Sequence, residues 1–546
     1  MFRLSPAIRR GPYQSSRSIF HLDRRWQSTS HASFWKRNKS ARVLLRFSVI
    51  TCGVGGIAYL TDKYCFSSIG VRSVRAIYVM TWIGYQYSKN LDKYDDLNEL
   101  HKKTAEMMLN MLMQNKGIYI KLGQAIANQG ELFPRVFQTV FKKLYDDAPS
   151  EKWSSVDKLL KANLGKDYET EIFTEIDHEP IASASIGQVH KAVLRNGDVV
   201  AVKVQHSYIQ RQLPNDLYVY RKISRLYEWF FELKLNLFTK FVSEQMNTET
   251  DFDKELRNSE RLRQLIASDN NNEFNVHIPI TYPEISTKQV LITEWCDGIP
   301  FSDKERLIAN NVDLALLMKQ FIGIFGRQIF KYGFLHADPH PGNLLVRLDS
   351  SGKQQIILLD HGLYTSFDEK FRITYSRLWK ELFNLNTSEI ERIAHSWGIY
   401  SVKFFANMVR LSPINQDVGQ EEDFYSVIRN FVSDESKFPL ELFFVIRSMR
   451  MIQTQNKNLG SPVNRINLLT NEMLSSSRSL YLHDFRQFIS FLRIKVILFF
   501  SNIAFLLIRL KQLLANDKYG SKKSGIEDYL EAYMKQSLQP LGIELE

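Results

Sequence analysis

The segment between Gly333 and Gly362 limits the possible folds of this chain more than any other. It contains Asp338 and Asn343 in the loop-like sequence His-Ala-Asp-Pro-His-Pro-Gly-Asn, and Asp360 follows an apolar run typical of a buried strand. An Asp and an Asn on one tight loop can face the same pocket, and an Asp at a strand end can join them. Carboxylate and amide oxygens are the ligands that a magnesium ion on phosphates requires. The segment therefore predicts a phosphoryl-transfer site, with Asp338 toward a hydroxyl or water and with Asn343 and Asp360 toward the metal.

A strand and a loop upstream supply the other half of such a site. The β-branched run Val199–Lys203 predicts a buried strand whose terminal ammonium group points at the phosphates. The segment Pro180–His190 precedes it in the position of a glycine-rich phosphate loop, but Gly187 is its one glycine. Small residues stand where flexible glycines would wrap phosphates: Ala182, Ser183, Ala184 and Ser185. We therefore expect altered nucleotide handling.

The order of these elements is that of a protein kinase, with two replacements. Ala337 stands where kinases carry Arg, and His361 stands where they carry Phe. The apolar run Gln289–Gly298 passes into a turn and has the layout of a kinase hinge, whose backbone meets adenine. Glu294 and Cys296 lie in this run. The expected fold class is α+β, a bilobal protein-kinase-like fold, and the expected cofactors are ATP and Mg²⁺.

Two further motifs make the chain resemble the UbiB family, also called the aarF-domain-containing or coenzyme Q-regulating atypical kinase-like proteins. Lys121-Leu122-Gly123-Gln124 reproduces the family's Lys-x-Gly-Gln element, and Glu249-Thr250-Asp251 reproduces its Glu-x-Asp element. Glu255 follows where the family places the helix C glutamate that pairs with the strand lysine. The phrase Leu359–Tyr364 and the N-terminus are similar to the aarF-domain-containing kinase 1 branch of mitochondria.

The resemblance implies roles for individual residues. It implies catalytic roles for Asp338, Lys203 and Glu255. It also implies that an N-terminal extension folds over the lobes, and that the Lys-x-Gly-Gln helix occupies the place where a protein substrate would dock. Lys121 and Gln124 would then lie near Glu249 and Asp251 and regulate the site. The family association points to coenzyme Q or another isoprenoid or phospholipid pathway, with a quinone or isoprenoid lipid among the expected partners.

The basic charge of the chain is concentrated at its N-terminus. The formal net charge is +12, but residues 1–46 hold eleven Lys or Arg against a single acidic residue, Asp23, so they account for +10 of it. The rest of the chain carries little net positive charge, so its composition does not indicate a basic binding surface. We therefore expect no nucleic-acid partner. Three widely spaced cysteines, Cys52, Cys65 and Cys296, support neither a disulfide framework nor a zinc site.

The N-terminal segment is typical of import into mitochondria. It is rich in Arg and Ser, which predicts a transit peptide over residues 1–40, although a disordered basic tail is the alternative. The uncharged run after Arg46 predicts a transmembrane anchor over residues 43–60, a length that is marginal because a span needs about 20 apolar residues. A buried core helix is the alternative. More positive charge before the run than after it predicts a matrix N-terminus and a body in the intermembrane space, on the inner membrane and its lipids.

The remaining chain, at 546 residues in all, is long enough for about two to four domains or one large bilobal unit with extensions. We expect a helical extension over residues 80–165, a small lobe over 168–298, a large lobe over 299–480 and apolar, basic C-terminal helices over 481–546. The apolar run Val496–Ile508 is short for a membrane span, so a helix that lies on a membrane surface or covers a lobe fits it better.

Three functional interpretations remain. The first is an atypical Mg²⁺-dependent kinase or ATPase of the mitochondrial inner membrane that supports coenzyme Q or lipid homeostasis. The second is a pseudokinase scaffold or lipid-binding protein without turnover. The third is a conventional protein kinase, which is disfavoured because no Ala-Pro-Glu and no recognisable activation segment follow Gly362. The kinase or ATPase interpretation is favoured over the scaffold, because a scaffold has no chemical need for all five polar residues of the site. These residues are Lys203, Glu255, Asp338, Asn343 and Asp360.

Overall fold

The computed structural model describes most of the chain. The described residues are 55–63, 66–90, 97–128, 135–145, 150–231, 235–384, 386–399, 437–477 and 484–514. They belong to two units, Met1–Cys65 and Phe66–Glu546. In the first unit residues 55–63 are helical, with Ile57, Tyr59 and Leu60 exposed. The predicted transit peptide and most of the predicted anchor lie outside the described residues.

The small lobe is built on an antiparallel sheet. Its strands are β1 (Phe173–Ile176), β2 (Ala182–Ser183), β3 (Gly187–Leu194), β4 (Val199–Gln205) and β6 (Val290–Glu294). The order is β1-β3-β4-β6, and β2 pairs with β3. Val200, Val202 and Val204 are fully buried on one face of β4, against α7 (Trp153–Leu164). Because side chains alternate along a strand, Lys203 is directed to the opposite face.

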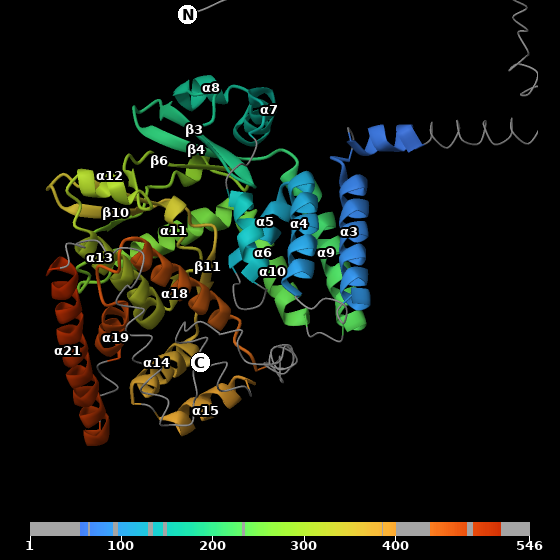
Figure 1. The fold of residues 1–546 in the computed structure, drawn as a ribbon. Coiled ribbons are helices and arrows are strands. Elements are labelled where there is room, and N and C mark those ends of the chain that lie inside the picture. Colours follow the sequence, from blue (N-terminus) through green and yellow to red (C-terminus); the bar gives the residue numbers. More distant parts are fainter. Residues whose placement is uncertain are drawn as a thin grey trace, which may run out of the picture. The chain divides into compact units, whose positions relative to one another are not determined.

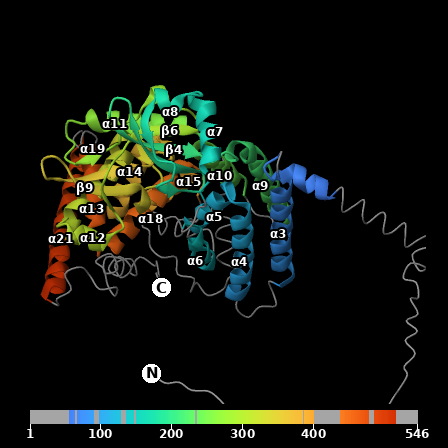
Figure 2. The ribbon, with the colours of Figure 1, turned by 90° about the horizontal axis from the view of Figure 1, so that it is seen from above.

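Helices separate β4 from the helix that carries Glu255. These helices are α9 (Ile209–Phe231) and α10 (Asn236–Glu249), and α11 (Phe252–Ala267) follows them. The α9 and α10 helices form the long insertion between Lys203 and Glu255. An N-terminal group packs on them: α3 (Ile69–Asn90), α4 (Leu97–Asn115), α5 (Ile118–Asn128) and α6 (Arg135–Phe141). Figure 1 shows α3, α4 and α5 in blue beside the green α9 and α10, and Figure 2 shows α3, α4 and α9 side by side from above. This group shares one apolar core with α9 and α10.

The large lobe combines small sheets with many helices. One sheet has the order β5 (Val276–His277), β10 (Gln354–Leu358), β9 (Leu344–Leu348) and β7 (Ile299–Pro300), and β8 (Phe334–His336) pairs with β11 (Tyr364–Ser366). The helices are α12 (Lys304–Ala309), α13 (Leu314–Arg327), α14 (Glu369–Asn384), α15 (Thr387–Ser396), α18 (Glu441–Asn458), α19 (Arg465–Ser476) and α21 (Phe485–Leu514). Shorter turns of helix occur in the large lobe and before it: Gln328–Tyr332 and Pro341–Asn343 in this lobe, and Lys142–Tyr145, α8 (Tyr168–Glu171) and Pro283–Ile285 earlier in the chain. The α13 helix is the centre of the core, because most of its side chains are buried.

The expected α+β, bilobal kinase-like fold class is confirmed. The C-terminal helix, however, is longer than its apolar run suggested. α21 has 30 residues, because the helix continues through Arg493 and Lys495, which interrupt its apolar residues. A count of consecutive apolar residues stops at these two cations and therefore misses a helix whose apolar residues recur every three or four positions.

Candidate phosphate and metal site

An ion pair joins the small-lobe sheet to α11. The Nζ atom of Lys203 lies 2.7 and 2.9 Å from the two carboxylate oxygens of Glu255. Glu255 is in the first turn of α11 and is buried. The same Nζ lies 3.7 Å from Oδ1 of Asp360, which comes from the large lobe. The predicted strand lysine, helix glutamate and strand-end aspartate therefore meet at one point.

Asp360 also organises the metal side of the site. Its Oδ1 accepts a hydrogen bond of 2.9 Å from the Gly362 N–H, and its Oδ2 accepts one of 3.2 Å from Nδ2 of Asn343. Asn343 ends the short helical turn Pro341–Asn343 and is held in place by β9, which begins at the next residue. A half turn of the Asn343 amide would bring its oxygen beside the Asp360 carboxylate. Two hard oxygen donors at one point fit a magnesium ion.

Asp338 faces an arginine that the sequence interpretation missed. Arg447 of α18 places Nη2 3.0 Å from Oδ1 of Asp338, and Arg447 is buried. Its Nε and Nη1 atoms are buried without a hydrogen-bond partner among the described residues. Ser448 fixes the helix here, because its hydroxyl donates to the His336 carbonyl at 3.2 Å. The one available signal was an arginine within the apolar run Leu442–Met449, where a charge needs a partner.

The α18 helix also contacts the insertion helices. Phe443 and Phe444 pack on the Phe241 ring of α10, with ring centroids 5.7 and 4.7 Å apart. One helix therefore touches both the loop that carries Asp338 and the helix that ends at Glu249. No sequence motif marked this link.

Lys121 reaches the site from α5. Its Nζ lies 2.9 Å from Oε2 of Glu249, so the contact that the resemblance implied is confirmed. Gln245 orients the same carboxylate by donating to Oε1 at 2.9 Å. Gln124 instead donates to the Leu144 carbonyl at 2.9 Å, which ties α5 to the turn after α6. Asp251 precedes α11, and its Oδ1 is buried without a hydrogen-bond partner among the described residues.

The charges of the site stabilise one another. Burial works against the positive charge of Lys121, yet the nearby carboxylates of Glu249, Asp338 and Asp360 raise its pKa. Burial also works against the negative charge of Asp360, yet Lys203 and Lys121 hold the pKa of this carboxyl well below its usual range. Lys121 therefore supplies positive charge to the two carboxylates that a metal and a hydroxyl would use. A bound magnesium ion would have to share them with Lys121.

Burial opposes the charge of Asp338 as well, and Arg447 and Lys121 lower its pKa. A carboxylate with a low pKa accepts hydrogen bonds but is a weak proton acceptor. Asp338 is therefore better suited to orient a hydroxyl group than to remove its proton in full.

The loop in the phosphate-loop position is tied to its own neighbours. The Ala184 N–H donates to the Gly187 carbonyl at 2.8 Å, and the Ala184 carbonyl is 2.9 Å from Nε2 of His206. Gly187 lies so close to β4 that an added Cβ would be 2.5 Å from the Val204 carbonyl oxygen. The Ala184 amide is thus used inside the loop.

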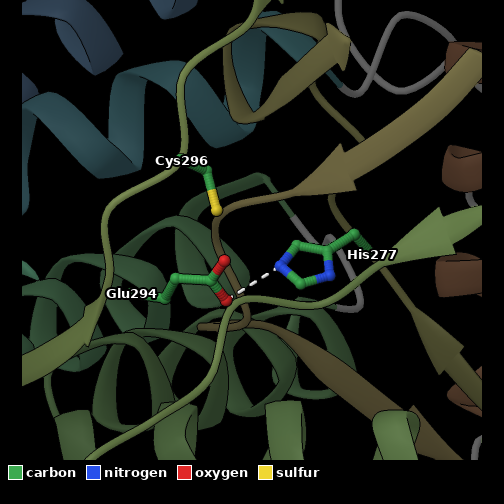
Figure 3. Close-up of side chains that lie close together, drawn as sticks. All are labelled: His277, Glu294 and Cys296. Atoms are coloured by element: carbon green, nitrogen blue, oxygen red, sulfur yellow. Dashed lines mark hydrogen bonds and ion pairs between the residues drawn. The ribbon is translucent and has the colours of Figure 1, made fainter. Parts of the chain in front are cut away.

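The hinge residues form a polar cluster (Figure 3). Nε2 of His277 lies 2.8 Å from Oε2 of Glu294, and the Ile280 N–H donates to the same oxygen at 3.0 Å. Cys296 is beside them, with all three ligand atoms within 4.8 Å of one another. This set of donors is one that zinc accepts. However, two hydrogen bonds already satisfy the Glu294 oxygen and the nearby Arg347 opposes a further cation, so we interpret the cluster as a hydrogen-bonded tie between β5 and β6.

His361, in place of the usual Phe, is held as a neutral ring. Its Nδ1 accepts from the Tyr364 hydroxyl at 2.8 Å, and its Nε2–H donates to the Leu358 carbonyl at 3.0 Å. Burial lowers the pKa of His361 to about 3, and the nearby His336 contributes to the shift. Asn258 of α11 donates to the His361 carbonyl at 3.0 Å. The residue therefore links the Asp360 segment to the helix that carries Glu255.

This environment predicts a loss of stability in acid. Between pH 6.5 and about 3 the unfolded chain binds a proton at His361 that the folded protein does not, so stability is present above pH 6.5 and is lost as the pH falls. The His361→Phe variant should show a shallower dependence of the unfolding free energy on pH, by up to about 1.4 kcal/mol per pH unit. Denaturant titrations from pH 7 to pH 4.5 measure this difference.

The exposed His178 provides the control, because its side chain is 58% exposed. His178→Asn, which removes a histidine from the surface, should change the slope less than His361→Phe does. Parallel pH profiles of the wild type and His361→Phe would contradict the assignment of a neutral buried ring.

Comparisons with known proteins agree with this geometry. A family model described as the ABC1 atypical kinase-like domain matches residues 143–394. An ABC1 family protein of Purpureocillium lilacinum is 33% identical over 471 residues, which cover 77% of this chain and 79% of the relative. An ABC1 family protein of Schizosaccharomyces pombe is 32% identical and covers 82% and 87%, and the AarF domain-containing protein kinase 1 of Gallus gallus is 32% identical and covers 66% and 70%. The chain thus belongs to the ABC1, or AarF-domain-containing, family of atypical kinase-like proteins.

Proposed function

We propose that this protein binds ATP with Mg²⁺ and acts as an atypical kinase or ATPase. The observation that carries the proposal is the meeting of Lys203, Glu255 and Asp360, with Asn343 hydrogen-bonded to Asp360. These are the groups that position phosphates and a metal in phosphoryl transfer. A protein without nucleotide chemistry has no need to keep the buried Glu255, the half-buried Asp360 and a lysine at one point, because it is costly to remove such charges from water.

Each residue has a distinct role in this proposal. Lys203, oriented by Glu255, binds the phosphates of the nucleotide, and Asp360 and Asn343 hold the metal. When bound, Mg²⁺ neutralises charge that develops on the phosphates. Asp338 orients the acceptor hydroxyl or water, and Arg447 keeps Asp338 ionised.

A pseudokinase scaffold that binds nucleotide or lipid without turnover is the second candidate. Two specific observations favour it. Arg447 engages the Asp338 carboxylate, and Lys121 contributes positive charge to the metal site. A conventional protein kinase is the weakest candidate, because the chain passes from Gly362 through β11 directly into α14 and leaves little room for an activation segment.

The cellular setting that we propose is the mitochondrial inner membrane, with a role in coenzyme Q or mitochondrial lipid homeostasis. The basic leader and the apolar run behind it support the location. Membership of the family supports the pathway, with a quinone or isoprenoid lipid as the proposed ligand. A single N-terminal span would leave the body in the intermembrane space.

Substitution of the two aspartates should separate binding from chemistry. Asp360→Asn should weaken Mg²⁺-dependent nucleotide binding by roughly tenfold or more, because a metal ligand loses its charge. Asp338→Asn should leave binding near the wild-type level and lower ATP turnover by about a hundredfold. Thermal shifts with ATP, with and without Mg²⁺, measure binding, and phosphate release in liposomes that contain quinone precursors measures turnover. Identical Mg²⁺-independent shifts in all three proteins would refute the metal assignment, whereas binding without turnover in the wild type would favour the scaffold.

Removal of Lys121 should open the site. Lys121→Met leaves Glu249 buried without its partner, which costs about 3 kcal/mol, while the loss of a competing cation should raise the affinity for Mg²⁺ nucleotide several-fold. The double variant Lys121→Met with Glu249→Gln should recover most of the stability and keep the higher affinity. Lys161→Met, which removes an exposed lysine paired with Asp157, is the control and should change neither quantity. Unchanged affinity in both Lys121 variants would contradict a regulatory role.

The proposed topology can be tested in isolated organelles. We expect added protease to digest the body of the protein in mitoplasts and to spare it in intact mitochondria, because the body faces the intermembrane space. Digestion is followed with an antibody against the large lobe, next to a soluble matrix protein as a control. Protection of the body in both preparations would place it in the matrix.

A further inference from the structure

Within the part of the chain that the structure describes, one face of the α21 helix is attached to the large lobe. Figure 1 shows it in red at the edge of the lobe beside α19 and α14, and it packs on both of these helices. Ile494 and Leu498 are the buried apolar residues of this face.

Polar contacts fix the helix over half of its length. Lys380 donates to Gln487 at 2.8 Å and Asn384 donates to Ser490 at 3.2 Å, both from α14. From the α19 side Asn464 donates to Ser501 at 2.9 Å. Asn467 of α19 completes the set, since its amide donates to the Leu498 carbonyl at 3.1 Å and to the Asn502 side chain at 2.6 Å. The helix is thus held parallel to the surface of the lobe.

The opposite face of α21 is a continuous apolar stripe. Eleven large apolar side chains on it are between 38% and 75% exposed: Phe485, Phe488, Ile489, Leu492, Val496, Phe499, Phe500, Ile503, Leu506, Leu507 and Leu510. Their spacing of three or four residues places them on one side of the helix. The stripe extends over 26 residues, or roughly 39 Å. Scattered exposed apolar residues are normal, but a stripe of this size indicates an interaction surface.

Basic residues border the stripe on both sides. Arg493 and Lys495 flank the inward-facing Ile494 and, at about 100° per residue, lie at opposite edges of the stripe. The Lys495 ammonium also donates a hydrogen bond of 2.9 Å to Asn471 of α19, so lipid phosphates would have to share it or replace this contact. Arg486 and Arg509 add charge nearer the ends, and the sequence of α21 contains no Asp or Glu. Long cationic side chains at the edges of an apolar face can reach lipid phosphates. Pairing of two α21 stripes in a dimer would bring these cations together, which disfavours a second copy as the occupant.

We propose that α21 lies in the plane of an anionic phospholipid bilayer, with its apolar stripe in the acyl region and the large lobe resting on the headgroups. The helix is long and apolar enough to cross a membrane by composition. A crossing would, however, break the contacts from Gln487 to Asn502 and draw Arg493 and Lys495 into the hydrocarbon, where charges are costly. This surface is separate from the proposed nucleotide site, and it makes an anionic phospholipid surface a partner of the large lobe.

Measurements of depth at single positions test the proposal in the full chain. A polarity-sensitive fluorophore is attached to Phe488→Cys, Phe499→Cys or Leu510→Cys in a background where the native cysteines are Ser. The vesicles contain phosphatidylcholine with about one third phosphatidylglycerol, and lipid-bound quenchers at a shallow and a deep acyl position report the depth. All three labels should shift to the blue and should be quenched more strongly by the shallow quencher, because the helix lies in the interface. A label at the exposed Lys158 of α7 is the control and should not respond.

The alternatives give different patterns. Deep quenching at Phe499 with shallow quenching at the two ends would show a crossing helix and overturn the proposal. Labels that are already shielded without vesicles would show a second copy or another part of the chain on the stripe, and labels that stay exposed to water with vesicles would show that no lipid binds. Each of these results overturns the proposal.

The basic edges provide a second, independent readout. Arg493→Gln with Lys495→Gln should reduce the apparent affinity of the Leu510 label for the anionic vesicles by roughly tenfold or more, since each basic residue near an anionic surface contributes strongly. The matched double variant Lys158→Gln with Lys166→Gln, at exposed lysines of the small lobe, should leave it unchanged. Equal affinities for pure phosphatidylcholine and for the anionic vesicles in all variants would overturn the electrostatic part of the proposal.

Discussion

The site depends on the half-buried carboxylate of Asp360. This group receives the Gly362 N–H and the Asn343 amide, and it lies 3.7 Å from the ammonium of Lys203. A carboxylate that loses part of its hydration needs such partners in compensation. The partners come from different elements, so the carboxylate joins the strand β4, the loop before β9 and the end of β10. A change at Asp360 would therefore disturb the arrangement of two lobes as well as the chemistry of one ligand.

The residues that could be predicted from the sequence share a property. Lys203, Asp338, Asn343 and Asp360 lie on or next to short apolar strands, and the alternation of buried and exposed side chains along a strand fixes their direction. Glu255 could not be predicted in this way, because two helices separate it from β4. Only the resemblance to a family identified it. In the structure Lys203 and Glu255 form an ion pair although α9 and α10 lie between them in the sequence.

Other parts of the site could not be predicted, for physical reasons. Arg447 lies more than a hundred residues beyond Asp338, and a single arginine in an apolar helix does not name its partner. Gln124 stands beside Lys121 in the same motif but faces another way, because positions three residues apart on a helix differ by about 60°. The length of α21 was missed because Arg493 and Lys495 interrupt its apolar residues, so that a run of apolar residues covers only part of the helix.

The helix α18 has a consequence for how this protein can vary. Phe444 packs against the insertion helix α10, and Arg447, three residues later, pairs with Asp338. The two contacts are less than one helical turn apart, so the rotation and the translation of α18 are set at both of them together. An insertion of one residue between them would turn Arg447 by about 100° away from the loop while Phe444 kept its place. The spacing between Phe444 and Arg447 is therefore constrained by both contacts. A change in the position of the insertion helices would require a matching change in the loop that carries Asp338.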